Sequence, residues 1–234
     1  MSWGNRRGIA GMLRALVLAA LALAPRAGHA AEEHAAAVSP LPLWHVGPYG
    51  GIGLNSPGGD KWGSIADRDH VIIGVRGSAE VLRWGRLAVA FSPEIVPALI
   101  LTNNPIYETV PMQRGGVTRQ TQVVVGSGPV YGIGLTPLGT EALLRTGSTM
   151  QAFAAVAVGV VWFTREVPVA NSKSYNYTIE VGGGLLWEYG RGRRMRFGYM
   201  FHHLSNAWSA VENPGLDGDI FYVGMERTLA LPVR

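Results

Sequence analysis

The feature that most constrains this chain is an alternation of apolar and polar residues with a period of two. In residues 176–189 the odd positions are mostly apolar or aromatic, and the even positions carry Asn, Thr, Glu and Gly, with Leu186 as the exception. Residues 70–82 and 194–203 alternate in the same way. Because successive side chains of a β-strand point to opposite faces, the pattern is typical of strands with one apolar and one polar face.

Eight segments of this kind predict eight strands, and the connections between them alternate in length. The strands are expected near 45–55, 69–82, 86–96, 120–133, 150–164, 176–189, 193–204 and 218–228. Tight turns are expected at 83–86 and 190–193 and long loops at 56–68, 97–119, 165–175 and 205–217, while 134–149 breaks the rule. Short turns at one end and long loops at the other are typical of outer-membrane barrels. The predicted fold class is therefore all-β, an eight-stranded antiparallel transmembrane β-barrel.

Periodicity alone does not say which face points inward, because a soluble lipocalin-like barrel alternates as well. That barrel, a periplasmic lipid carrier, stays open as an alternative. Charged residues make up only 15% of the chain, against roughly 25% in a typical soluble domain, which favours the membrane. Acids and bases also share a face with glycines, as suits a narrow polar interior without a pore. One feature counts against the membrane barrel: the chain ends Leu231-Pro232-Val233-Arg234, without the terminal aromatic residue common in outer-membrane barrels.

The first 30 residues resemble a secretory signal peptide, with a positive start, an apolar stretch at 15–24 and small residues before position 31. Ten apolar residues are too few for a spanning anchor, which needs about 20. The longest later apolar run, 152–163, is also too short. We therefore expect cleavage of residues 1–30, a barrel domain over 31–234, and an outer-membrane location in a Gram-negative cell.

Charge and cysteine content exclude several functions. Four of the 20 Lys and Arg residues lie in the first 30 positions, which hold no acid, so the remaining 16 balance the 16 Asp and Glu residues. The mature chain is thus neutral, and basicity gives no argument for a nucleic-acid partner. The absence of cysteine excludes disulfides, thiolate metal sites and thiol nucleophiles. The glycines at 51–53 and 182–184 precede no helical pattern, so we expect them to pack inside the barrel.

Residues able to do chemistry concentrate at 202–219. His203 and Ser205 are two apart, so on a strand both side chains share one face, roughly 7 Å apart. A serine hydroxyl is a weak nucleophile that a histidine base activates, and a carboxylate orients that histidine. Asp217 is a candidate for the carboxylate, with Glu212 and Asp219 as competitors. A metal site is not expected, because adjacent His202 and His203 point to opposite faces.

This arrangement resembles the PagL-type lipid A 3-O-deacylases, eight-stranded outer-membrane barrels that remove an ester-linked acyl chain from lipid A. The family signature, a His-x-Ser-Asn sequence followed by Asn, Gly and an acid 8, 10 and 12 residues after the Ser, falls on His203, Ser205, Asn206, Asn213, Gly215 and Asp217. The resemblance implies a serine esterase with His203 as base, Ser205 as nucleophile and Asp217 as orienting acid. It also implies Asn206 as oxyanion donor, Asn213 as loop support, lipid A as substrate and no cofactor.

Two residues depart from the family pattern, and one feature places the site. Asp217 stands where the family usually has Glu, so its reach to His203 depends on close strands. Trp208 replaces a usual Gly near the proposed oxyanion site. His203 and Ser205 share odd parity with the apolar residues of 195–201, so the site is expected on the lipid-facing outside of the barrel. The leading alternative is a non-catalytic barrel with a structural or adhesive role, in which these polar residues only form a loop.

Overall fold

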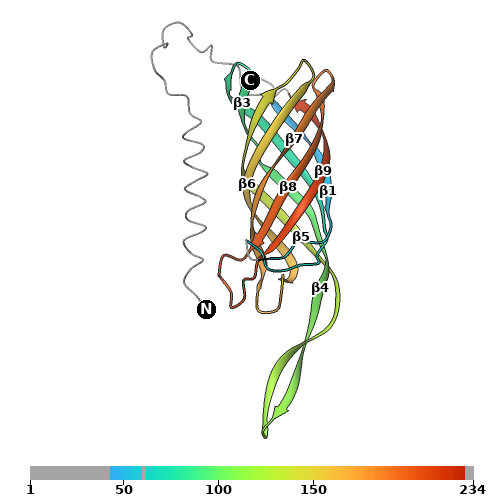
Figure 1. Ribbon diagram of the computed structural model, residues 1–234, viewed down its shortest axis with the longest axis vertical. Coiled ribbons are helices and arrows are strands. Elements are labelled where there is room, and N and C mark those ends of the chain that lie inside the picture. Colours follow the sequence, from blue (N-terminus) through green and yellow to red (C-terminus); the bar gives the residue numbers. More distant parts are fainter. Residues whose placement is uncertain (1–42, 60–61, 230–234) are drawn as a thin grey trace, which may run out of the picture. The chain divides into compact units, whose positions relative to one another are not determined.

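The structure, a computed structural model, describes residues 43–59 and 62–229, which form a β-barrel (Figure 1). The strands are β1 (Trp44–Gly53), β2 (His70–Trp84), β3 (Leu87–Phe91), β4 (Glu94–Arg114), β5 (Val117–Arg145), β6 (Met150–Val167), β7 (Lys173–Gly190), β8 (Arg193–Ser205) and β9 (Leu216–Leu229). They pair in the order β1-β9-β8-β7-β6-β5-β3-β2, and β2 pairs back with β1 to close the ring. The expected signal segment, residues 1–30, lies outside the described residues.

Strands β3 and β4 occupy one position in the ring, because both lie between β2 and β5. The chain leaves the regular strand only at Ser92 and Pro93, where proline has no N–H to donate to the ladder. All neighbouring strands are antiparallel. The ring therefore has eight positions, and the predicted eight-stranded antiparallel barrel is confirmed.

The long loop predicted at 97–119 is wrong, because these residues form most of a β-hairpin. Strand β4 continues to Arg114 and pairs with β5 from Val117 onward. Gly115 and Gly116 form the turn with positive φ angles of 60° and 77°, as a type I′ turn requires. The hairpin extends beyond the barrel (Figure 1). Both of its faces lie outside the barrel wall, so it lacks the alternation by which strands were recognised.

The connection expected at 134–149, which breaks the alternation of short turns and long loops, is also mostly strand. β5 continues to Arg145, and its register with β6 shifts between Leu135 and Leu138. Before the shift the exposed apolar side chains have odd numbers, as in Tyr131 and Ile133, and after it they have even numbers, as in Leu138 and Leu144. This bulge reverses the parity, which is why the alternation failed to predict a continuous strand.

The apolar face of the strands points outward, as predicted. Along β7 the side chains of Tyr177, Val181, Leu185, Trp187 and Tyr189 are 37–50% exposed. The alternate residues of β7, from Asn176 to Glu180, are buried. The described residues contain no helix long and apolar enough to cross a membrane. An apolar exterior around a polar interior is the pattern of a membrane-spanning barrel.

A network of buried ion pairs fills the middle of the barrel. Glu226 accepts from Arg194 at 2.5 Å and from Arg196 at 2.6 Å. Arg196 also lies 2.9 Å from Glu141. Farther along, Glu94 pairs with Arg76 and accepts a hydrogen bond from Tyr49 at 2.5 Å. Arg194 and Arg196, two of the four arginines between positions 191 and 196, are thus interior structural residues.

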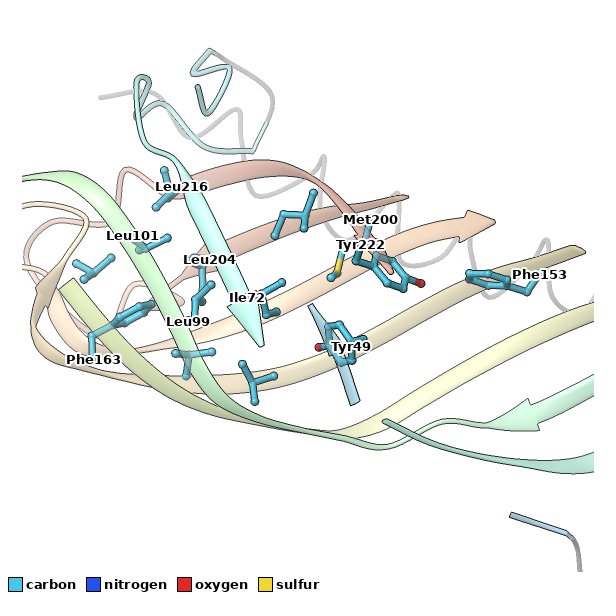
Figure 2. Close-up of a cluster of buried hydrophobic side chains, with 14 of the residues drawn as sticks. Tyr49, Ile72, Leu99, Leu101, Phe153, Phe163, Met200, Leu204, Leu216 and Tyr222 are labelled. Carbon is cyan, nitrogen blue, oxygen red and sulfur yellow. The ribbon is translucent and has the colours of Figure 1, made fainter. Parts of the chain in front are cut away.

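Toward the long-loop end, apolar side chains replace the ion pairs inside the barrel. Figure 2 shows this cluster, in which Leu99, Leu101, Leu204 and Leu216 have no exposed surface. Leu204 and Leu216 oppose each other at the ends of β8 and β9. This packing fixes the two strand ends from which the site residues project.

The buried network predicts a large stability effect. Glu226→Gln removes the charge that two buried arginines share, and breaking a buried pair in this way costs about 3–5 kcal/mol. We expect a corresponding fall in the free energy of unfolding of the purified barrel in detergent. Glu80→Gln is the matched control, because Glu80 pairs with Arg83 at the surface and exposed pairs contribute at most about 1 kcal/mol. Equal losses in the two variants would contradict the role of the network.

Candidate active site

His203 and Asp217 lie directly opposite each other in the register of β8 and β9. His203 Nδ1 is 2.6 Å from Asp217 Oδ1, and both side chains are buried. A carboxylate only accepts, so Nδ1 carries the proton and Nε2 is left as the basic nitrogen. The short Asp side chain reaches the imidazole because the register makes the two residues cross-strand neighbours.

The loop between β1 and β2 covers this pair. The N–H of Gly63 donates to Asp217 Oδ2 at 2.9 Å, and the Trp62 ring meets the His203 ring edge to face at 5.4 Å between centroids. Ser64 donates from its N–H to the Pro214 carbonyl at 2.9 Å, which ties the same loop to the loop before β9. His203 lies on the outer side of the strand as predicted, but Trp62 leaves it only 8% exposed.

Ser205 ends β8 on the same face as His203. In this structure Ser205 Oγ donates to Asn213 Oδ1 at 3.1 Å rather than to the imidazole. The N–H of Ala207 donates to Ser205 Oγ at 3.2 Å. The chain therefore brings His203 and Asp217 into contact, and it holds Ser205 against the following loop.

The two predicted asparagines brace that loop in different ways. Asn206 is fully buried and its Nδ2 donates to the Glu212 carbonyl at 2.7 Å. Asn213 Oδ1 accepts from the N–H of Asn206 at 3.0 Å as well as from Ser205. That acceptor role fixes the amide orientation, so Asn213 Nδ2 faces away from Ser205 Oγ. Asn206, expected as the oxyanion donor, has its amide N–H engaged within the loop.

The three candidate acids occupy different surroundings. Asp217 contacts His203, as described above. Asp219 accepts a hydrogen bond from Tyr199 at 2.5 Å. Glu212 lies in the loop, and its main-chain carbonyl accepts from Asn206 and Ser172. Of the three, Asp217 is the one in contact with the imidazole.

His202 points into the barrel, opposite to His203. It is 1% exposed, and its ring lies 6.2 Å from that of His70. Its Nε2 is 3.7 Å from Glu180 Oε1. The adjacent histidines therefore do not share one site, in agreement with their alternate positions on the strand.

Trp208, which departs from the family pattern, adopts an unusual backbone conformation. Its φ is +62° and that of Ala207 is +51°, in the left-handed region that glycine occupies without strain. The Trp208 side chain is 71% exposed. A glycine fits this position better because it has no Cβ to clash in the left-handed region. The tryptophan keeps the same turn at a cost in conformational energy.

Residues 104–226, more than half of the chain, match the model of the lipid A 3-O-deacylase (PagL) family. The chain belongs to this family. The matched range contains β5 to β8 and all five predicted site residues. A search of the curated proteins gave no match.

The match to the PagL structure supports the fold of this family member. The crystal structure of the outer-membrane enzyme PagL matches with a TM-score of 0.55 and 12% identity, over 77% of this chain and 97% of that one. Neisserial surface protein A (NspA) matches with a TM-score of 0.48 and 10% identity, over 80% of this chain and 97% of that one. At 12% identity the PagL match concerns the fold, and the family match above rests on sequence.

Trp62 and Gly63 were not found from the sequence, because they lie about 140 residues before His203 and carry no motif. A Cβ on Gly63 would lie 2.9 Å from the backbone nitrogens of Leu216 and Asp217, so any larger residue displaces the loop or the carboxylate. We expect Gly63→Ala to leave the barrel folded and to lower turnover on lipid A by up to ~100-fold, because a displacement of about 1 Å in an active site can cost that much.

The matched control for that variant is Gly126→Ala, since a Cβ there meets no atom within 4 Å. Turnover of purified, folded variants on lipid A measures both effects. Unchanged turnover in Gly63→Ala would show that the loop contact does not position Asp217.

The backbone at position 208 gives a separate prediction. Trp208→Gly relieves a left-handed strain of about 1–2 kcal/mol, partly offset by the greater freedom of glycine in the unfolded chain. We expect slower amide hydrogen exchange in residues 206–210. Val211→Gly is the control, because Val211 is 83% exposed and lies outside the positive-φ residues, so exchange should accelerate there. Faster amide exchange in both variants would contradict the backbone strain expected at Trp208.

Proposed function

We propose that this barrel is an outer-membrane lipid A deacylase that works as a serine esterase. The observation that carries the proposal is the 2.6 Å contact between His203 Nδ1 and Asp217 Oδ1 beside Ser205, in a member of the lipid A 3-O-deacylase family. The contact leaves a basic imidazole nitrogen on the outer wall of the barrel, on the face where a membrane lipid arrives.

The expected membrane orientation agrees with this substrate. In bacterial outer-membrane barrels the short turns are periplasmic and the long loops extracellular. Ser205 ends β8 at the long-loop end, and the turn before β8 is the two-residue link at 191–192. In this orientation Ser205 lies at the outer leaflet, where the ester bonds of lipid A are found. Export by a signal peptide at residues 1–30 remains a prediction.

The proposed reaction is a two-step hydrolysis of an acyl ester. Ser205 Oγ attacks the ester carbonyl carbon while His203 Nε2 accepts the hydroxyl proton. The bond between the carbonyl carbon and the lipid A oxygen then breaks, and His203 returns the proton to that oxygen. Water activated by His203 releases the fatty acid from Ser205. Asp217 holds the imidazole orientation and stabilises its charged form throughout, and no cofactor is needed.

The oxyanion of this reaction needs hydrogen-bond donors that are not already engaged. Asn206 was the expected donor, but its Nδ2 is bonded to Glu212. Asn213 Nδ2 makes no hydrogen bond to the described residues, but Oδ1 is the amide atom that faces Ser205 Oγ. Asn213 therefore donates to the oxyanion only if its amide turns when Ser205 rotates toward His203, while Asn206 braces the loop.

One observation favours the alternative of a non-catalytic barrel. Ser205 donates to Asn213 rather than to His203, as a serine with a purely structural role in the loop would. The esterase mechanism requires the hydroxyl to rotate toward His203 Nε2 when the substrate binds. The two functions therefore differ in whether Ser205 is needed for any change in lipid A.

Mass spectrometry of lipid A from cells that do or do not produce this protein separates them. We expect a species that has lost one ester-linked acyl chain in cells producing the wild type. Cells producing Ser205→Ala serve as the matched control for other deacylases of the host. Identical lipid A in all three, with the barrel present in the outer membrane, would favour the non-catalytic function.

A further inference from the structure

Two arginines lie side by side on the outer wall at the short-turn end of the barrel. Arg193 begins β8 and pairs directly with Arg227 of β9. Both side chains are exposed, as is Arg191 in the adjoining turn. The N–H of Thr228 donates to the Gly192 carbonyl at 2.8 Å, which holds the turn against β9. Three positive charges therefore gather at one corner of the barrel.

These arginines mark the edge of the apolar belt. The next outward-facing pair along the same strands is Met195 and Met225, which is apolar and, at Met225, 55% exposed. On the neighbouring strand β7, Trp187 and Tyr189 are each 44% exposed. Trp and Tyr are enriched where a membrane protein meets the headgroup region, so the arginine pair lies at headgroup depth.

Like charges directly opposite each other destabilise an antiparallel pair. None of the three arginines forms an ion pair with a carboxylate of residues 43–59 and 62–229, whereas the nearby Arg194 is paired inside the barrel and Arg83 at the surface. An anion bound between Arg193 and Arg227 would relieve this cross-strand repulsion. Guanidinium groups bind phosphate oxygens through paired N–H donors, so a phosphate suits this corner.

The position of the pair identifies which phosphate is available. β8 has 13 residues, Arg193–Ser205, which is about 40 Å of strand and about 30 Å of height at the usual barrel tilt. The arginines therefore lie one bilayer thickness from Ser205. With Ser205 at the outer leaflet, they lie among the phospholipid headgroups of the inner leaflet.

We propose that Arg193 and Arg227, assisted by Arg191, form a binding site for the phosphodiester headgroup of an anionic phospholipid. Tyr189 and Trp187 line the approach, and Met195 and Met225 contact the start of the acyl chains. The site is separate from the His203 site, and it does not depend on whether the barrel hydrolyses lipid A.

The test compares heat unfolding of the purified barrel in a nonionic detergent with and without phosphatidylglycerol. In detergent alone, Arg193→Gln/Arg227→Gln should unfold at the same temperature as the wild type or higher, because the repulsion is gone. Added phosphatidylglycerol should raise the unfolding temperature of the wild type by several degrees and that of the double variant by less than half as much. Native mass spectrometry should show about tenfold weaker lipid binding to the variant.

The matched control is Arg114→Gln/Arg119→Gln, which removes the same charge from exposed arginines on the β4–β5 hairpin, outside the barrel wall. This control should respond to phosphatidylglycerol like the wild type. Equal responses in all three proteins, or equal losses in both double variants, would overturn the proposal. Inorganic phosphate giving the full stabilisation at the same concentration would also overturn it, because the site would then bind free phosphate rather than a lipid.

Discussion

Ser205→Ala should abolish release of an ester-linked fatty acid from lipid A, with a fall in turnover of about 10³-fold or more. The variant loses only the contacts of one hydroxyl, to Asn213 and Ala207, so the barrel should fold. On gels it should, like the wild type, change mobility only after heating, because a closed hydrogen-bonded barrel resists detergent until heated. His203→Ala should have a similar effect. The double variant should be no worse than either single one, because base and nucleophile act as a unit.

Ser127→Ala is the matched control for this series. Ser127 is an exposed serine on the β4–β5 hairpin, so its loss tests whether removing any serine hydroxyl affects the assay. Turnover should equal that of the wild type. Retention of wild-type turnover in Ser205→Ala would remove the nucleophile and with it the proposed mechanism.

Asp217→Asn should reduce turnover strongly, yet about 10- to 100-fold less than Ser205→Ala, because an orienting acid contributes less than the nucleophile. The Asn side chain has one neutral oxygen in place of the two charged oxygens that accept from His203 Nδ1 and from the Gly63 N–H. His203 therefore loses its fixed tautomer. Turnover on lipid A by folded protein is again the measurement.

Asp219→Asn is the control for charge and position, being two residues farther along the same face of β9. Asp219 accepts from Tyr199 rather than from His203, so this variant should stay within about twofold of the wild type. If Asp219→Asn lowers turnover and Asp217→Asn does not, then the orienting acid is Asp219, the next outward-facing residue of β9, and not Asp217.

The inward and outward faces of the strands could be predicted because lipid and a packed interior demand different side chains along each strand. The same parity is enough to predict that His203 lies on the outer wall. The argument from parity fails where a strand no longer separates lipid from the packed interior. The hairpin formed by β4 and β5 leaves the barrel and has water on both sides, and the bulge near Pro137 exchanges the two faces midway along β5.

The sequence pattern also predicted the residue that contacts His203, but not the residues that hold it in place. Asp217 could be predicted from its spacing after Ser205. Its contact with His203 depends on the register between β8 and β9, which no local sequence pattern indicates. Gly63 and Trp62 reach the site through a loop from the other end of the chain. Their role arises from tertiary packing, as does the engagement of Asn206 within the loop.

Hydrolysis in ¹⁸O-labelled water tests the central claim most directly. Purified barrel in lipid bilayers is incubated with lipid A, and the products are weighed by mass spectrometry. The two-step mechanism predicts that the released fatty acid carries one ¹⁸O atom and that the freed hydroxyl of lipid A carries none, with neither product formed by Ser205→Ala. Intact lipid A after incubation with the folded wild type, or label in the lipid A hydroxyl, would contradict it.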